Sequence, residues 1–373
     1  MVDRTSGERS RLYLYDNLKF LLIFLVVLGH FTDGCTIDLF GTGASDPQLP
    51  QTMYLNKIFI FIYGFHMPLF MFISGLFHRR RKDEKFNGQK VLVFFVLGLT
   101  LKFLLYASRV IFQTKIDREE VGDLFFNFSG GDGTFWYLFA LAAYIAICYV
   151  CRNSKPWFVL AFSIVLALFV GYDNAIGDDY SLSRIIVFFP FYYGGYLIDP
   201  KKLMELVNRW YIRLVSLATV AIWAYFSFAK TELVYPLRML FTGKNSYLDV
   251  ETVTLMDCTF WHRLLAMAIS AVLCFAFIGI SVNVRIPFIS TGGTRTLQIY
   301  FWHRTVIYAL TYYGFQQALA QMFPNNWWIY YSLTALVVTA VLSLKIFGKP
   351  LDGIMNCVKG VDRKIIKEKD NGK

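Results

Sequence analysis

Two polar side chains in the first long apolar stretch are of types that can do acid–base chemistry, and their spacing places them on one face of a helix. The stretch reads LYDNLKFLLIFLVVLGHF and contains Lys19 and His30. Eleven residues at about 100° each make three full turns plus about 20°, so both side chains lie on one stripe of a helix, about 16 Å apart. Asp16 precedes Lys19 by three residues and is predicted to pair with it. An ionisable group at bilayer depth is a candidate for function, and an imidazole titrates near neutral pH, so His30, Lys19 and Asp16 are the candidate catalytic residues. The alternative is a polar seam that only orients helix packing.

The second apolar stretch, IFIYGFHMPLFMFISGLF, also carries polar groups. Pro68 leaves one backbone carbonyl without its helical donor, so a kink is expected there, with a neighbouring helix or water supplying the missing hydrogen bond. Ser74 and Gly75 are small enough for another helix to approach closely. His66 and Ser74 are therefore predicted to line an internal cavity.

A basic cluster follows this stretch immediately, in the segment HRRRK at 78–82. Arg79, Arg80 and Arg81 are predicted to hold phosphate groups at the cytoplasmic face, because guanidinium groups bind phosphate through paired hydrogen bonds. A cluster that only fixes membrane topology is the alternative.

A late stretch, TRTLQIYFWHRTVIY, repeats the combination of an imidazole with other polar groups. With Thr296 at 0°, Tyr300 falls at about 40°, His303 at about −20° and Arg304 at about 80° on a helical wheel. Tyr300, His303 and Arg304 are predicted to line the same cavity as His66, although a purely structural buried His303 is an equal alternative.

The remaining polar residues of the apolar stretches give weaker signals. Lys57, Arg184 and Arg263 lie at the ends of stretches, where long basic side chains reach the lipid headgroups, and we expect them to do so. Cys35 and Cys258 are both predicted outside the membrane and could pair. The sequence contains no H-E-x-x-H, G-x-S-x-G or P-loop motif, and no metal site is predicted.

The composition indicates the environment in which these residues act. Apolar residues make up 56% of the 373 residues and charged residues only 17%, against about 25% in soluble domains. Six cysteines are too few for a disulfide-rich module, and the apolar content is too high for a disordered chain. The net charge of +11 would suggest nucleic acid, but the basic residues cluster in short loops between apolar blocks, so no nucleic-acid partner is predicted.

A helix needs about 20 mainly apolar residues to cross the hydrocarbon layer of a membrane. The fold predicted on that basis is an all-α, polytopic membrane bundle of about ten helices. A membrane domain at 1–350 is predicted to be followed by a basic cytoplasmic tail at 351–373. The ten stretches are 12–31, 57–77, 90–113, 134–151, 156–171, 183–198, 211–229, 260–282, 294–317 and 326–346.

The distribution of basic residues predicts the orientation of these stretches. Alternate segments, starting with the N-terminus, hold 25 Lys and Arg, and the loops between them hold 5. Because positive charge accumulates on the cytoplasmic side, both termini are predicted to be cytoplasmic.

Three stretches together resemble the acyltransferase 3 family of ten-helix membrane acyltransferases, in its fucose 4-O-acetylase-like branch. They are DNLKFLLIFLVVLGH with its basic residue and histidine, FHMPLFMFISGLF, and IYFWH. Many members have Arg where this chain has Lys19. The resemblance covers nearly the whole chain, and it implies a multi-pass protein of a bacterial plasma membrane.

The resemblance also implies a reaction. Acyl-CoA, with acetyl-CoA as the expected donor, binds from the cytoplasmic side as a co-substrate, and a hydroxyl of a carbohydrate or cell-envelope glycan accepts the acyl group. An imidazole is matched to removing the proton of that hydroxyl, so His30 is the candidate general base. No tightly bound cofactor is expected, and the partners are membrane lipid, acyl-CoA and the glycan. A transporter or flippase for a glycan or lipid-linked sugar is the alternative, because intramembrane charges can also line a path.

Overall fold

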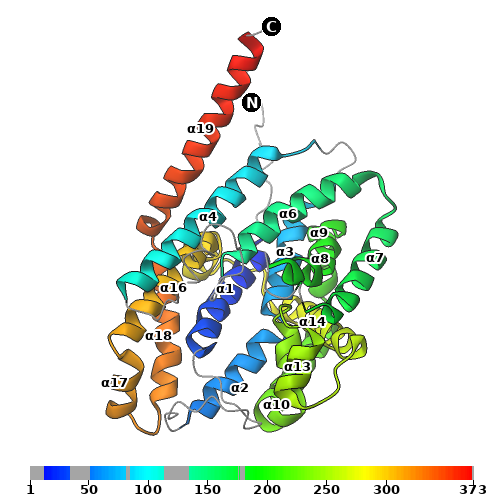
Figure 1. The fold of residues 1–373 in the computed structure, drawn as a ribbon. Coiled ribbons are helices and arrows are strands. Elements are labelled where there is room, and N and C mark those ends of the chain that lie inside the picture. The colour runs from blue at the N-terminus through cyan, green and yellow to red at the C-terminus, as the bar shows by residue number, and fades with distance from the viewer. Residues whose placement is uncertain are drawn as a thin grey trace, which may run out of the picture.

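The structure is a computed structural model that describes residues 12–33, 51–80, 85–112, 134–174, 176 and 181–371, with side chains described up to residue 360. These residues form helices joined by turns and contain no β-strand, so the all-α prediction is confirmed for them (Figure 1). The helices are α1 (Tyr13–Asp33), α2 (Thr52–Tyr63), α3 (His66–His78), α4 (Gly88–Ile111), α6 (Trp136–Val150), α7 (Pro156–Phe169), α8 (Leu182–Leu197), α9 (Pro200–Val207), α10 (Trp210–Ala229), α11 (Thr231–Val234), α12 (Leu237–Phe241), α13 (Tyr247–Thr254), α14 (Phe260–Ile280), α15 (Pro287–Gly292), α16 (Thr296–Tyr312), α17 (Phe315–Met322), α18 (Trp327–Leu342) and α19 (Lys349–Asn371).

Each of the ten predicted stretches coincides with one helix or, for the second stretch, with the pair α2–α3. Fewer of them are long and apolar enough to cross a membrane unaided. A seventh segment qualifies if α18 and the helix after it, bent by 69° at a short break, count as one span. The chain is therefore a polytopic helical membrane protein. The six qualifying segments are Tyr13–Thr32, Thr52–His78, Gly88–Ile111, Trp136–Asn153, Trp210–Ala229 and Phe260–Ile280.

Three of the other helices are too short or too polar to qualify. Helices α7, α8 and α16 contain 14, 16 and 17 residues, which corresponds to about 21–26 Å of rise against a hydrocarbon layer of about 30 Å. Two of them also carry polar groups, Arg184 in α8 and His303 and Arg304 in α16, which lower their hydropathy. The total of ten spans stays a prediction.

Helices α1 and α16 lie side by side and run in the same direction. At their beginnings, the backbone of Gly293 lies against that of Asp16, and further along Arg304 lies against His30. Parallel neighbours must cross a membrane in the same sense. In the ten-span count these helices are the first and the ninth, so their parallel packing agrees with the predicted topology.

The second span is broken between α2 and α3, and the break lies at Gly64 and Phe65 rather than at Pro68. Pro68 falls in the first turn of α3, where its missing N–H is tolerated. The carbonyl of Gly64, four residues before Pro68, accepts a hydrogen bond from Ser270 Oγ of α14 at 2.7 Å. The prediction that a neighbouring helix satisfies the freed carbonyl is thus confirmed, whereas the predicted position of the kink is wrong by a few residues.

Two further side chains hold this break. The indole of Trp223 in α10 donates to the carbonyl of Phe61 at 2.9 Å, and Nδ1 of His66 lies 3.0 Å from the carbonyl of Ile62. A Cβ on Gly64 would lie 2.5 Å from the Trp223 ring, so the indole needs the glycine there. The break is therefore a supported feature of the fold.

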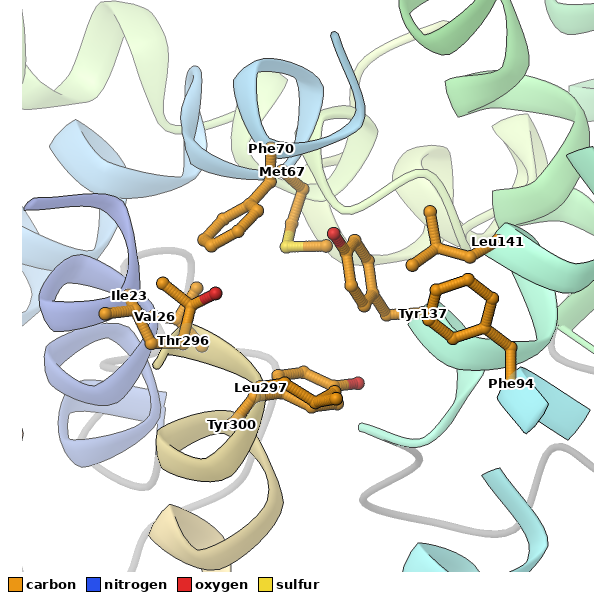
Figure 2. Close-up of a pocket in the computed structure, with 10 residues that line it drawn as sticks. All are labelled: Ile23, Val26, Met67, Phe70, Phe94, Tyr137, Leu141, Thr296, Leu297 and Tyr300. Carbon is orange, nitrogen blue, oxygen red and sulfur yellow. The ribbon is translucent and has the colours of Figure 1, made fainter. Parts of the chain in front are cut away.

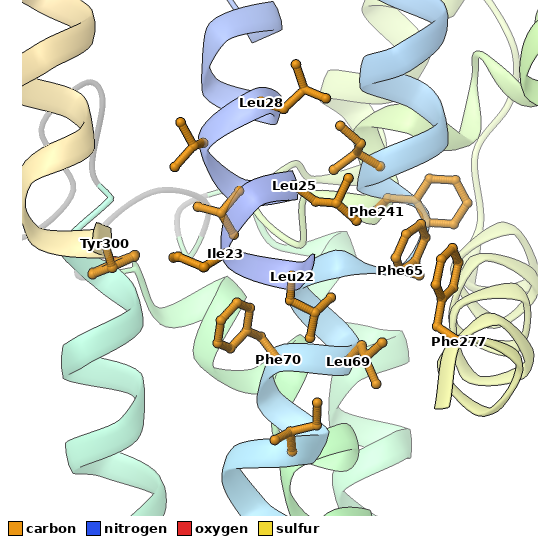
Figure 3. Close-up of a cluster of buried hydrophobic side chains, with 14 of the residues drawn as sticks. Leu22, Ile23, Leu25, Leu28, Phe65, Leu69, Phe70, Phe241, Phe277 and Tyr300 are labelled. Carbon is orange, nitrogen blue, oxygen red and sulfur yellow. The ribbon is translucent and has the colours of Figure 1, made fainter. Parts of the chain in front are cut away.

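The core is built around α1, which packs on α2, α3, α14, α15, α16 and α18 (Figure 3). Leu22 of α1 faces Leu69 of α3, Leu25 points toward Phe241, and the ring of Phe65 stacks on Phe277 of α14 with centroids 3.8 Å apart. Because apolar side chains surround α1 on most sides, its few polar residues are held in fixed positions.

Helices α3 and α8 approach one another at the backbone. A Cβ on Gly75 would lie 1.9 Å from the carbonyl oxygen of Tyr192, and one on Gly195 would lie 2.0 Å from that of Phe72. The close approach predicted at Gly75 is confirmed, and Gly195 is its counterpart on α8.

The expectation that Arg263 reaches the headgroups is wrong. Its side chain is fully buried, Nη2 donates to the carbonyl of Asn245 at 2.7 Å, and the guanidinium lies 5.1 Å from the ring centre of Tyr247. The segment with α11–α13 folds over the start of α14 and covers it. Lys57, in contrast, donates to the carbonyl of Phe228 at 2.8 Å in an exposed position, as its place at a span end suggests.

The predicted orientation is testable at two exposed residues that flank α14. Leu255 precedes this helix and is predicted outside, whereas Val284 follows it and is predicted inside. In intact cells, a membrane-impermeant maleimide is expected to label Leu255→Cys and not Val284→Cys. Both variants are expected to react after permeabilisation, and the reverse pattern in intact cells would reject the orientation.

Candidate active site

The basic end of α1 has the predicted ion pair. Lys19 Nζ lies 3.0 Å from a carboxylate oxygen of Asp16 and 5.1 Å from the ring centre of Phe77 in α3. The lysine keeps part of its surface accessible, so it remains open to a second, anionic partner. The predicted pairing of Asp16 with Lys19 is confirmed.

At the other end of α1, three polar side chains meet between α1 and α16. The rings of His30 and His303 lie 5.2 Å apart, and Nη1 of Arg304 lies 3.5 Å from Nδ1 of His30. That distance is at the outer limit of a hydrogen bond, so the guanidinium acts mainly through its charge. His30 is partly exposed, and the predicted shared face of α16 is turned toward α1.

The other two imidazoles of the region are tied to the backbone. Nδ1 of His303 lies 2.7 Å from the carbonyl of Tyr300, and Nδ1 of His66 bonds the carbonyl of Ile62. A carbonyl only accepts, so in both rings Nδ1 carries the proton and Nε2 is the free acceptor. His303 and His66 are 0% and 4% exposed, whereas His30 is partly exposed. Of the three, His30 has the most room to meet a substrate.

Arg184 of α8 is turned into the protein, against the expectation that it reaches the headgroups. Its guanidinium lies 5.3 Å from the ring centre of Trp136, a buried side chain of α6. A basic residue at a span end looks the same in the sequence whether its side chain points out or in, so this contact could not be predicted.

A cavity of about 240 Å³ lies between α1, α3, α4, α6 and α16 (Figure 2). On α1 it is lined by Ile23 and Val26, which share the helical stripe of Lys19 and His30 and lie between them. The cavity therefore lies along the stripe between the two predicted functional residues of α1, neither of which is among its lining residues. The lining residues are Ile23, Val26, Met67, Phe70, Phe94, Tyr137, Leu141, Thr296, Leu297 and Tyr300.

Two hydroxyl groups connect the cavity wall to α3. Ser74 Oγ donates to the carbonyl of Phe70 at 2.8 Å and lies 2.9 Å from the hydroxyl of Tyr137. Ser74 thus stands behind the wall, which Tyr137 of α6 forms. Sequence reasoning missed Tyr137 because nothing in its surroundings separates it from an interfacial aromatic residue.

A second, polar pocket of about 880 Å³ opens near the end of α3. It contains Arg79 and Arg80 from the predicted phosphate cluster, whereas Arg81 lies outside the described residues. Arg152 and Lys202, which sequence reasoning did not connect with this site, complete its basic lining. The lining residues are Arg79, Arg80, Arg152, Asn153, Pro156, Tyr196, Leu197, Asp199 and Lys202.

The two arginines of the α3 end have different roles in this pocket. Nη2 of Arg80 donates to the carbonyl of Arg152 at 2.8 Å and so holds the wall together. Arg79 pairs with Asp199, with 2.6 Å between Nη2 and the carboxylate. The backbone N–H of Lys201 and, to a lesser extent, the charge of Arg79 hold the pKa of Asp199 below its usual value, so it stays ionised at neutral pH.

Cysteine and metal chemistry find little support in the described residues. Cys258 is buried with a free thiol, whose pKa burial raises to about 11, and Cys35 lies outside the described residues. Within the described ranges, no three His, Cys, Asp or Glu side chains are grouped in a way that could hold a metal ion.

Comparison with known proteins identifies the family. The acyltransferase domain family matches residues 12–345. The chain is 26% identical over 178 residues to nodulation protein NolL of Sinorhizobium fredii (strain NBRC 101917 / NGR234), and this match covers 44% of each chain. The chain thus matches less than half the length of that relative, and no solved structure matches it. The chain is a multi-pass membrane protein, and it belongs to the acyltransferase domain family.

Proposed function

We propose that this acyltransferase moves an acyl group, with acetyl as the expected one, from acyl-CoA to a hydroxyl of a carbohydrate or cell-envelope glycan in a bacterial plasma membrane. The observation that carries the proposal is the position of the apolar cavity along the stripe between Lys19 and His30. Acyl-CoA is largely apolar around its thioester and carries a charged nucleotide at its other end. Its thioester end therefore suits an apolar cavity that lies beyond a basic group. The glycan acceptor rests on the resemblance of the three sequence stretches alone.

In the proposed reaction, the acceptor hydroxyl oxygen bonds to the thioester carbonyl carbon while His30 removes the hydroxyl proton. The carbon–sulfur bond then breaks, and the CoA sulfur leaves with the proton that His30 returns. An imidazole suits both steps because it takes and gives a proton near neutral pH. Arg304 and His303 position the His30 ring, and His66 and Ser74 support the cavity wall from α3.

The donor nucleotide is assigned to the inner pocket. Asp199 lines that pocket, and the next carbonyl, of Pro200, accepts a hydrogen bond from the hydroxyl of Tyr15 at 2.6 Å. The ring of Phe77 packs edge-on against Tyr15 and lies under Lys19. The pocket and the basic end of α1 are therefore neighbours, and Lys19 bridges the phosphates and the thioester arm.

The test is release of free CoA thiol from acetyl-CoA by the purified full-length protein in lipid nanodiscs, with and without candidate sugars. Acceptor-dependent release that disappears in His30→Ala supports the proposal. Wild-type protein that inserts correctly and releases no CoA with any acceptor or any short acyl-CoA would reject it.

Neutralising the exposed cations of the inner pocket is expected to weaken donor binding. Because two screened surface contacts contribute about 0.2–1 kcal/mol each, Arg79→Gln/Lys202→Gln should raise the KM for acetyl-CoA roughly two- to thirtyfold, with kcat unchanged. The measurement is initial rate against acetyl-CoA concentration at two salt concentrations, and the variant should be the less salt-sensitive.

The matched control is Lys230→Gln, which removes one exposed charge far along the chain from the pocket. It should leave the KM unchanged. Arg80 is kept intact in the test because its guanidinium holds the Arg152 carbonyl. An unchanged KM in the double variant would mean that the basic cluster only fixes the membrane topology.

A further inference from the structure

The wall of the cavity carries a buried tyrosine hydroxyl, that of Tyr300, whose proton has no acceptor among the described residues. The Tyr300 side chain is 8% exposed, and the backbone group that acts on its oxygen, the N–H of Tyr137, is itself a donor. The Tyr300 ring lines the cavity together with Ile23 and Val26 of α1 (Figure 2). A buried hydroxyl proton without an acceptor costs stability, and a ligand that accepts a hydrogen bond there would remove that cost.

The second tyrosine of the cavity is differently placed. Ser74 Oγ has a single proton and donates it to the carbonyl of Phe70, so the Tyr137 hydroxyl is the donor in its contact with Ser74. The Tyr137 proton is therefore already used. Of the two tyrosine hydroxyls in the wall, only that of Tyr300 has its proton free for a ligand.

The helical register places Tyr300 next to the His30 cluster. Tyr300 precedes Arg304 by four residues on α16, and Val26 precedes His30 by four residues on the parallel helix α1. Since Arg304 lies against His30, the cavity at Tyr300 and Val26 begins about one helical turn, or about 6 Å, from the imidazole. His303 lies between, with ring centres 5.8 Å from Tyr300 and 5.2 Å from His30.

We propose that the Tyr300 hydroxyl donates a hydrogen bond to the carbonyl oxygen of the bound thioester and stabilises the negative charge that forms there. This role rests on the proposed acyl transfer. When the acceptor oxygen bonds to the carbonyl carbon, the π electrons move to the carbonyl oxygen, and the hydroxyl proton goes to His30. The oxyanion then reforms the carbonyl and expels the CoA sulfur, which takes the proton from His30. Tyr300 keeps its own proton throughout, and the hydrogen bond that it donates becomes stronger as negative charge develops on the carbonyl oxygen.

The test compares wild type with Tyr300→Phe, which keeps the ring and removes only the hydroxyl. Loss of one oxyanion donor should lower kcat by about 10²–10³-fold, with little change in the KM for acetyl-CoA. Binding of S-ethyl-CoA, which has a methylene in place of the carbonyl, should be equal in both proteins and shows that the cavity is intact. In the infrared spectrum of bound [1-¹³C]acetyl-CoA, the carbonyl stretch should lie at lower frequency in wild type than in Tyr300→Phe.

The matched control is Tyr144→Phe, which removes a buried hydroxyl that donates to the carbonyl of Ile185 and lies outside the cavity walls. Its kcat and carbonyl frequency should equal those of wild type. A Tyr300→Phe variant with normal kcat, or with the wild-type carbonyl frequency, would overturn the role of Tyr300 and leave acyl transfer standing. Weaker S-ethyl-CoA binding with normal kcat would make Tyr300 a wall residue only. Wild type without acceptor-dependent CoA release would instead overturn the proposed function itself.

Discussion

His30→Ala is expected to lower the kcat of acyl transfer by about 10²–10⁴-fold, the usual size of a general-base effect. His30 is the most accessible of the three imidazoles in the cluster, and it follows Val26, which lines the cavity assigned to the thioester, by one helical turn. Because the alanine removes the proton acceptor and leaves the inner pocket untouched, the KM for acetyl-CoA should change little. The measurement is steady-state turnover of purified variants matched for folding and membrane insertion.

The control for this prediction is His262→Gln. His262 is another imidazole, but its Nδ1 accepts a hydrogen bond from the N–H of Thr259 at the start of α14, away from the cluster. Its replacement should leave kcat unchanged. Near-normal turnover in His30→Ala would contradict the proposed role, and His303, with its free Nε2, would be the next base to test.

Gly195→Ala is expected to disrupt the packing of α3 against α8, whereas Gly194→Ala is not. The new Cβ at 195 would lie 2.0 Å from the carbonyl oxygen of Phe72, a backbone atom that cannot move aside, but at 194 no atom lies within 4 Å. Overpacking costs about 1–3 kcal/mol or more, so Gly195→Ala should lose several degrees in Tm and much of its monodisperse yield. Size-exclusion profiles and thermal unfolding in detergent would measure both.

The comparison of two adjacent glycines on one helix separates packing from helix propensity. Alanine favours a helix over glycine by about 1 kcal/mol, so Gly194→Ala should be neutral or slightly stabilising. Equal stability of the two variants would mean that α3 and α8 are not in backbone contact.

Sequence reasoning located the helices and several contacts because each depends on one helix or its immediate neighbour. The pairing of Lys19 with Asp16 follows from their separation of three residues, and the small side chain of Gly75 indicates a close approach whatever the partner helix is. The shared face of Tyr300, His303 and Arg304 follows from helical periodicity.

The parts that sequence reasoning missed depend on which helices converge. Arg184 was expected at the headgroups and lies instead beside Trp136, because α8 packs on α6. Arg263 is buried because a separate loop folds over it. The break in the second span falls at Gly64, since the Trp223 ring occupies the space that a side chain there would need. Each of these contacts joins segments that are far apart in the sequence, so none can be predicted from one stretch alone.

The hydrogen bonds that hold the break between α2 and α3 also set an order for the assembly of the enzyme. Their donors, Trp223 and Ser270, are 162 and 206 positions further along the chain than the carbonyls that they satisfy, and Arg304 is 274 positions from His30. The first two spans are therefore synthesised and inserted long before their partners exist. Until then, the carbonyls at the break have no protein donor and can be satisfied only by water. Chains that end before α16 lack Thr296, Leu297 and Tyr300, so the wall of the cavity beside α1 is complete only after that helix is made.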